Sequence, residues 1–280
     1  MSKNDLKDLM LTAKLDLAES VRAKWFLVYA LVFGSVMLLL LGSGLTESRV
    51  MGFTGLSRTL TTYIQICMAI LPVFILITTV RSVAGDREAG VFEYLLSLPV
   101  SLGAWYWGKL FGRFVIVFLP VFVAMVLAVV WASILGHGTP WEEFLFNTGL
   151  IVSLTWCFLG LGMLISSLAR SPDVAQGVAF TVWLLLLLFL DLIFLGAMVR
   201  EQMPHQLVVL ISLTNPMQVF RAASILVFDP ELVLMGPSAH VILDAFGRVG
   251  FLAYGFLYPA IFGTLSALAG FSIFRRSDLP

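Results

Sequence analysis

Six long apolar stretches dominate the pattern of hydrophobic and polar positions along this chain of 280 residues. A helix needs about 20 mostly apolar residues to cross the roughly 30 Å hydrocarbon core of a bilayer. The stretches reach that length, and they cover residues 25–45, 60–80, 114–135, 144–169, 174–199 and 249–274. The pattern therefore predicts an all-α polytopic membrane protein with six transmembrane helices.

The composition supports this prediction and excludes several classes of protein. Hydrophobic residues make up 60% of the chain and charged residues only 12%, whereas soluble domains have about 45–50% and about 25%. So few polar groups could not cover the surface of a soluble enzyme. The same composition excludes a disordered chain and a nucleic-acid-binding protein.

Basic residues are distributed unevenly between the two sides of the predicted helices. Twelve of the 17 Lys and Arg residues fall on the side that holds both termini. Because the cytoplasmic loops of membrane proteins carry an excess of Lys and Arg, we expect both termini to be cytoplasmic. The outer loops would then be residues 46–59, 137–143 and 200–248.

Three segments outside the predicted spans are informative. Residues 1–24 place apolar side chains at helical spacing between charged ones, which predicts an amphipathic helix in the membrane interface. Residues 86–98 predict a short helix with a charged and an apolar face, suited to dock a soluble partner. Residues 200–248 contain turn signals such as Asn215-Pro216, and they predict short helices that cap the outer face.

The stretch between the second and third predicted spans contains a motif. It resembles the signature of ABC-2-type permeases: Glu88-x-Gly90-x-x-Glu93-x-Leu95-Leu96-x-x-Pro99-Val100-Ser101, followed by Gly108-Lys109. In that family the motif forms a coupling helix that sits in a groove of a separate ATPase subunit. This chain departs from the commoner pattern at Val91, where Thr is frequent, but it keeps the charged and apolar positions.

The resemblance implies a single ABC-2 transmembrane domain over residues 1–280, of the type V exporter-like architecture, in the inner membrane of a bacterium. It also implies a homodimer that binds two copies of a cytoplasmic ABC ATPase. ATP and Mg would bind to that partner, and the chain itself would hold no cofactor. The bilayer is its other partner.

The expected ATPase-coupling residues belong to the predicted coupling helix, residues 86–98, and to the proline that ends it. We expect charge-assisted contacts with the ATPase from Asp86, Arg87, Glu88 and Glu93. We expect apolar contacts from Val91, Phe92, Leu95 and Leu96. Gly90 would allow close approach of backbones or mark an irregular helix start, and Pro99 would end the helix.

A narrower resemblance involves the outer loop and the Asp86-Arg87-Glu88-Ala89-Gly90 form of the motif. The chain is similar here to permeases of the complex that matures the copper enzyme nitrous-oxide reductase. That similarity implies a periplasmic partner protein, and the candidate residues for binding it are Asn215, Pro216, Phe220 and Arg221. The alternatives are an exporter of a lipid, polysaccharide, drug or ion, an intramembrane enzyme, or a passive membrane anchor.

Little else in the sequence points to chemistry. There is no nucleotide-binding fingerprint, so ATP would be hydrolysed by another chain. Asp191 is the one acid well inside a predicted span, and it is a candidate polar site because a carboxylate in the bilayer is costly. We expect no catalytic residue and no metal site, since neither nucleophile–base nor metal-ligand spacings occur.

Overall fold

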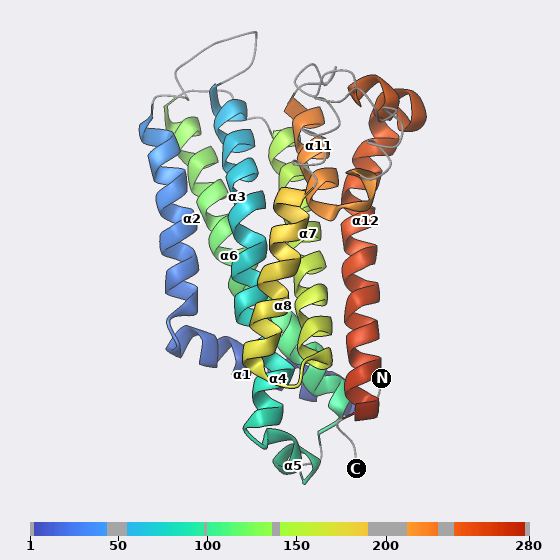
Figure 1. Cartoon of the computed structure of the whole chain (residues 1–280). Helices are drawn as coiled ribbons and strands as arrows, with labels where there is room; N and C mark the ends of the chain where they lie inside the picture. Colours follow the sequence, from blue (N-terminus) through green and yellow to red (C-terminus); the bar gives the residue numbers. More distant parts are fainter. Residues whose placement is uncertain are drawn as a thin grey trace.

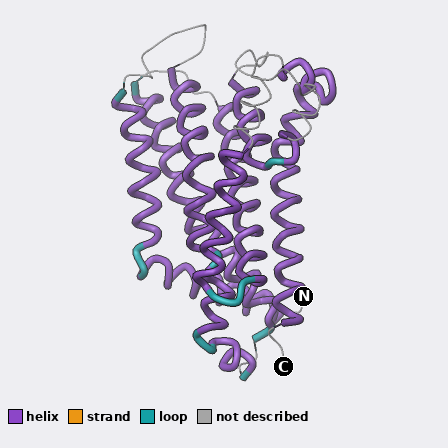
Figure 2. Tube along the Cα trace, in the orientation of Figure 1, coloured by secondary structure: helices purple, strands orange, loops and turns teal. Residues whose placement is uncertain are grey.

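The protein is an all-helical bundle in the parts of the chain that the computed structural model describes, residues 3–43, 55–97, 100–135, 141–189, 212–228 and 238–277 (Figure 1). Figure 2 shows helix in almost all of these residues, with short connections. The helices are α1 (Lys3–Arg22), α2 (Trp25–Gly42), α3 (Gly55–Thr79), α4 (Arg81–Glu88), α5 (Val91–Leu96), α6 (Leu102–Ile134), α7 (Trp141–Leu168), α8 (Pro172–Leu184, continued by a π-helical turn over Leu185–Phe189), α11 (Pro216–Phe228) and α12 (Ser238–Ser277).

Five of the described helices are long and apolar enough to cross a membrane: α2, α3 with its continuation α4, α6, α7 and α12. They correspond to the first, second, third, fourth and sixth predicted spans. The fifth predicted span, 174–199, is helical from Pro172 to Phe189. The rest of it, with Asp191, lies outside the described residues, so the sixth crossing stays a prediction.

The start of α6 differs from the sequence prediction. The helix begins at Leu102 rather than at residue 114, and the side chain of Ser101 caps it by accepting a hydrogen bond from the backbone N–H of Ala104 at 3.2 Å. The predicted span began only at residue 114 because the preceding stretch contains two cations, Lys109 and Arg113. Both are paired within the protein, so they lie inside the helix without an unpartnered charge.

Helix α1 lies across one end of the bundle, and α4 and α5 project beyond the same end (Figure 1). We call this the α1 end. The chain turns from α1 into α2 at Lys24, whose φ of 62° is in the left-handed region. Close packing joins α1 to α6: a methyl group on Gly108 would lie 2.8 Å from the carbonyl oxygen of Leu9, and one on Gly112 would lie 2.9 Å from that of Ala13.

Helix α11 lies within the predicted outer loop 200–248, but its position differs from the prediction of helices that cap the outer face. A short helix is present, but it is packed into the bundle beside α7 and α12 instead of lying on the surface (Figure 1). Its Phe220 and Leu226 are completely buried. Gln65 on α3 donates a hydrogen bond to Ser224 at 2.7 Å, and Tyr254 on α12 donates one to the carbonyl of Leu213 at 2.8 Å.

Helices α7 and α12 form the most extensive helix pair, and glycines set their separation. A methyl group on Gly160 would overlap the carbonyl group of Gly263, and one on Gly263 would lie 2.5 Å from the Cα of Cys157. Small residues at such crossings let helix backbones approach closely in membranes, where dispersion and polar contacts replace the hydrophobic effect between helices.

We predict that Gly160→Ala destabilises the bundle by about 1–3 kcal/mol, because the added methyl group must push α7 and α12 apart. Gly34→Ala on α2 is the matched control, since nothing lies within 4 Å of its methyl position. Thermal unfolding of the purified protein in detergent measures both. Equal melting temperatures for the two variants would contradict the glycine-limited crossing.

Candidate functional site

The α4–α5 segment, residues 81–97, is the part of the chain that projects farthest from the bundle at the α1 end (Figure 1). The sequence predicts one helix over 86–98, and this prediction is wrong. The chain forms two short helices that are separated at Ala89 and Gly90. Gly90 has a φ of 67°, a conformation that side chains with a Cβ rarely adopt, so it ends α4 and reorients the chain before α5.

Helix α4 and the end of α7 satisfy each other's free backbone groups. The hydroxyl of Ser166 accepts hydrogen bonds from the backbone N–H groups of Val83 and Ala84 at 2.9 and 3.0 Å. In return, the Arg87 guanidinium donates to the carbonyls of Ala169 at 2.6 Å and Ser167 at 3.3 Å. Because helix ends leave N–H and C=O groups without intrahelical partners, this exchange fixes α4 on α7 at both of its ends.

A second anchor joins α4 to α6. Lys109 forms an ion pair with Asp86, and its ammonium lies 4.7 Å from the ring centroid of Trp105. Lys109 is almost completely buried, at 8% exposure. A buried charge is tolerated only with a partner, so the pair fixes α4 against the first turns of α6.

A third anchor is aromatic and reaches α12. The ring centroid of Phe92 on α5 lies 5.2 Å from that of Trp105 and 5.1 Å from that of Phe274, and these two are 5.3 Å apart. All three side chains are buried. The prediction that Phe92 fills a groove of the ATPase is therefore corrected, because its ring already fills a pocket of its own chain.

The side chains that remain outward form the candidate docking surface. Glu88 is exposed at the end of α4, Tyr94 is 67% exposed on α5, and Val91 is half-buried between them. Glu93, Leu95 and Leu96 belong to α5, but their side chains lie outside the described part of the structure, as does Pro99. Asp86 and Arg87 were expected to contact the ATPase, but within the chain their side chains bind α6 and α7.

Sequence reasoning missed Tyr94 as well as the anchoring residues Ser166 and Phe274. Tyr94 lies between Glu93 and Leu95 of the motif, where its aromatic ring matched neither the charged nor the apolar set. Ser166 and Phe274 are distant in the chain from the α4–α5 segment, and nothing local marks them as its neighbours.

The four outer-loop candidates do not form a partner-binding surface. Asn215, Pro216 and Phe220 are buried, and Arg221 alone of the four is exposed. Asn215 caps α11 by accepting from the backbone N–H of Met217 at 2.9 Å, and its amide donates to the carbonyl of Leu186 at 2.7 Å. The Asn215-Pro216 pair is therefore a structural joint between α11 and the π-helical turn after α8.

The other candidates add no site within the described residues. Asp191 falls outside them, so its role stays a hypothesis. No group of three or more potential metal-ligating side chains is found in the described part of the chain. The free cysteines Cys67 and Cys157 are buried in the bundle.

A bundle of five membrane-length apolar helices, with a projecting segment anchored to it at one end, is the architecture of a multi-pass membrane protein. The chain belongs to the ABC-2 family of transporter proteins, whose family model matches residues 10–279. It is a permease subunit, and permeases of this family have no ATPase site of their own.

Two known proteins are similar over most of this chain. The "Probable ABC transporter permease protein NosY" of Stutzerimonas stutzeri is 25% identical over 230 residues, which cover 80% of this chain and 83% of the relative. The protein of the same description from Pseudomonas aeruginosa is 26% identical over 229 residues, which cover 78% and 81%. The similarity to these permeases is distant.

We predict that Arg87→Gln loosens α4 from α7, because the neutral amide cannot replace the charge-assisted hydrogen bonds to the carbonyls of Ala169 and Ser167. Losing such bonds costs about 1–3 kcal/mol. The backbone amides of α4 should therefore exchange hydrogen roughly tenfold faster or more, as mass spectrometry can measure. Arg170→Gln is the matched control, since Arg170 is exposed next to the same carbonyls. Unchanged exchange in Arg87→Gln would contradict the anchor.

Proposed function

We propose that the α4–α5 segment is the docking site of a cytoplasmic ABC ATPase, and that this permease converts ATP hydrolysis by that partner into movement of its own helices. The observation that supports the proposal is the combination of an outward surface, with Glu88 and Tyr94, and three inward anchors on α6, α7 and α12.

The anchors define how force would pass from the ATPase into the membrane. A displacement of α4 is transmitted to α7 through Ser166 and Arg87. The same displacement reaches α6 through the Asp86–Lys109 pair, and α12 through Phe92. ATP and Mg bound to the partner supply the energy, and the partner shifts the helices only if it binds one of their arrangements better than the other.

The orientation and assembly follow from this docking. The α1 end would be cytoplasmic, with both termini there, in the inner membrane of a bacterium, in keeping with the excess of basic residues on that side. A homodimer of the permease with two ATPase copies would give two symmetric docking sites. Helices α2 and α8 both present exposed apolar side chains, such as Leu31 and Phe180, that a second copy or lipid would cover.

The finer assignment is to the maturation of the copper site of nitrous-oxide reductase. It is supported by the distant similarity to the NosY permeases and by the motif variant Asp86-Arg87-Glu88-Ala89-Gly90. A periplasmic partner protein would then be reshaped, or a cargo such as copper or a sulfur species moved, at the end of the bundle opposite α1. That partner would bind elsewhere than on Asn215, Pro216 and Phe220, which are buried.

The docking proposal predicts that Glu88→Lys combined with Glu93→Lys lowers ATPase association at least about tenfold, because reversed charges repel the groove that the acids match. Co-purification of the co-expressed cognate ATPase measures association, and the amount of permease in the membrane fraction confirms insertion. Glu142→Lys is the matched control, as Glu142 is an exposed acid at the start of α7, at the opposite end. If the ATPase co-purified with the double variant as fully as with the wild-type permease, the docking proposal would be wrong.

The maturation assignment predicts that a bacterium lacking this chain secretes nitrous-oxide reductase that is depleted in copper. Copper content of the purified reductase measures the effect, and the wild-type gene should restore it while the Glu88→Lys, Glu93→Lys variant should not. A fully copper-loaded reductase in the deletion strain would refute the assignment to this complex. That result would not bear on the ATPase-docking proposal, which the co-purification experiment tests separately.

A further inference from the structure

Helix α1 carries its acidic and its basic side chains on opposite sides. A helix completes a turn in about 3.6 residues, so positions nine apart, such as Lys7 and Asp16 or Asp5 and Lys14, face opposite ways. Positions 11 apart, such as Asp5 and Asp16, face the same way. Among the described side chains of α1, the acidic side therefore holds Asp5, Asp8, Asp16 and Glu19, and the basic side holds Lys7 and Lys14.

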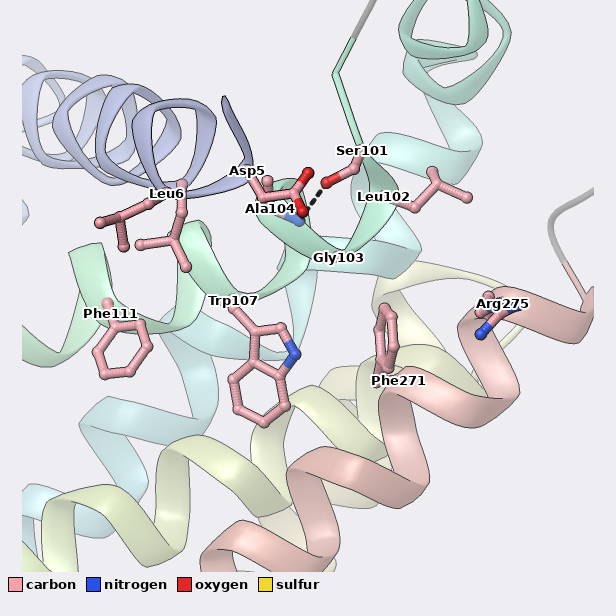
Figure 3. Close-up of a pocket in the computed structure, with 11 residues that line it drawn as sticks. Asp5, Leu6, Ser101, Leu102, Gly103, Ala104, Trp107, Phe111, Phe271 and Arg275 are labelled. Carbon is pink, nitrogen blue, oxygen red and sulfur yellow. Dashed lines mark hydrogen bonds between the residues drawn. The ribbon is translucent and has the colours of Figure 1, made fainter. Parts of the chain in front are cut away.

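Two of the acids place the acidic side of α1 against the rest of the protein. Asp16 is buried and pairs with Arg113 of α6 at 3.4 Å. Asp5 lines a groove together with Ser101 and Ala104 at the start of α6 (Figure 3). Because the lysines lie on the opposite side of the helix, they point away from α6.

Close packing against α6 fixes this orientation of α1. A methyl group on Gly108 would lie 2.7 Å from the Cβ of Thr12, and one on Gly112 would lie 3.1 Å from the Cβ of Asp16. A rotation of α1 would bring larger side chains into a contact that leaves no room even for a methyl group. The basic side of α1 is therefore held outward.

The basic side combines cations with exposed apolar side chains. Lys7 and Lys14 are exposed, and within the described residues neither of them forms an ion pair. Residues three, four or seven apart share a helix face, so these lysines are bordered by Met10, Leu11 and Val21. The three apolar side chains are 54%, 58% and 51% exposed. A side that faced only water would have no use for them.

This combination fits a lipid surface better than a soluble protein. Helix α1 turns at Lys24 directly into α2, which is long and apolar enough to cross a membrane, so α1 lies at the level of the lipid headgroups. The α4–α5 segment projects farther from the bundle than α1 does (Figure 1). Lysine ammonium groups at this level pair with phosphates, while their alkyl stems and the neighbouring apolar side chains enter the acyl region.

We infer that the basic side of α1 binds anionic phospholipid of the phosphatidylglycerol type through Lys7 and Lys14. The two lysines are about 10.5 Å apart along the helix axis, so they engage the phosphates of neighbouring headgroups. Phosphatidylcholine also offers a phosphate, but its choline cancels the charge and weakens the attraction. This binding does not depend on the docking of an ATPase.

Native mass spectrometry of the full-length protein in detergent, titrated with phosphatidylglycerol or phosphatidylcholine, measures the affinity for the first bound lipid. Lys7→Gln with Lys14→Gln removes both cations, and Lys7→Arg with Lys14→Arg keeps them. Lys14→Glu with Glu19→Lys takes as much positive charge from the basic side at unchanged net charge, since Glu19 is an exposed acid of the other side. Arg275→Gln with Arg276→Gln is the matched control, because it removes two exposed cations of α12 at the same end. Melting temperatures show that each variant is folded.

The wild-type protein should bind phosphatidylglycerol about tenfold more tightly than phosphatidylcholine, because each lysine beside the anionic headgroups adds attraction. The Gln pair and the Lys14→Glu, Glu19→Lys variant should each lose most of this preference, while the Arg pair and the α12 control keep it. Equal wild-type affinity for the two lipids, or an unchanged preference in the Gln pair, would overturn the inference. An equal loss in the α12 control, an unchanged preference in the charge-exchanged variant, or an acidic protein held by the same lysines in place of lipid would overturn it as well.

Discussion

Lys109 and Arg113 lie one helical turn apart in α6, and their ion pairs fix the arrangement of the α1 end. Lys109 pairs with Asp86 of α4, and Arg113 pairs with Asp16 of α1 at 3.4 Å while donating a hydrogen bond to the carbonyl of Thr78 on α3. A cation near the hydrocarbon is costly unless an acid or carbonyl accepts it. The two cations therefore hold three neighbouring elements to one face of α6, and the close approach of α1 at Gly108 and Gly112 follows that face.

This arrangement makes the α4–α5 segment a rigid part of the bundle and not a loose loop. Arg87 ties it to α7, Asp86 to α6 and Phe92 to α12, so the segment is held by contacts with three long helices. The glycine contact between α7 and α12 then couples two of those helices to each other along their length. Close-packed interfaces of this kind switch between discrete arrangements more readily than they deform, as a transporter requires.

The apolar spans were predictable because their length and composition are local properties of the chain, and five of them correspond to described helices that are long and apolar enough to cross a membrane. The first turns of α6 were missed because pairing cancels the charge of Lys109 and Arg113, and a pairing with Asp86 or Asp16 is not visible in a hydrophobicity pattern. The prediction of a single helix over 86–98 was wrong because the helix is interrupted at Gly90. The glycine in the motif allows a left-handed backbone conformation. The sequence does not show that this conformation is adopted, because it depends on how α4 and α5 pack against the rest of the bundle.

The sequence by itself determined the class of protein, the number and place of most membrane helices, and the ABC-2 permease motif, because hydrophobic length and local residue order encode these. The tertiary structure alone decided which motif residues face outward. Phe92 and Asn215 looked available to partners in the sequence, yet both are buried, while Glu88 and Tyr94 stay exposed. The reason is physical: burial depends on side chains such as Phe274 and Ser166 that come from distant helices, and no local pattern records which helices will meet.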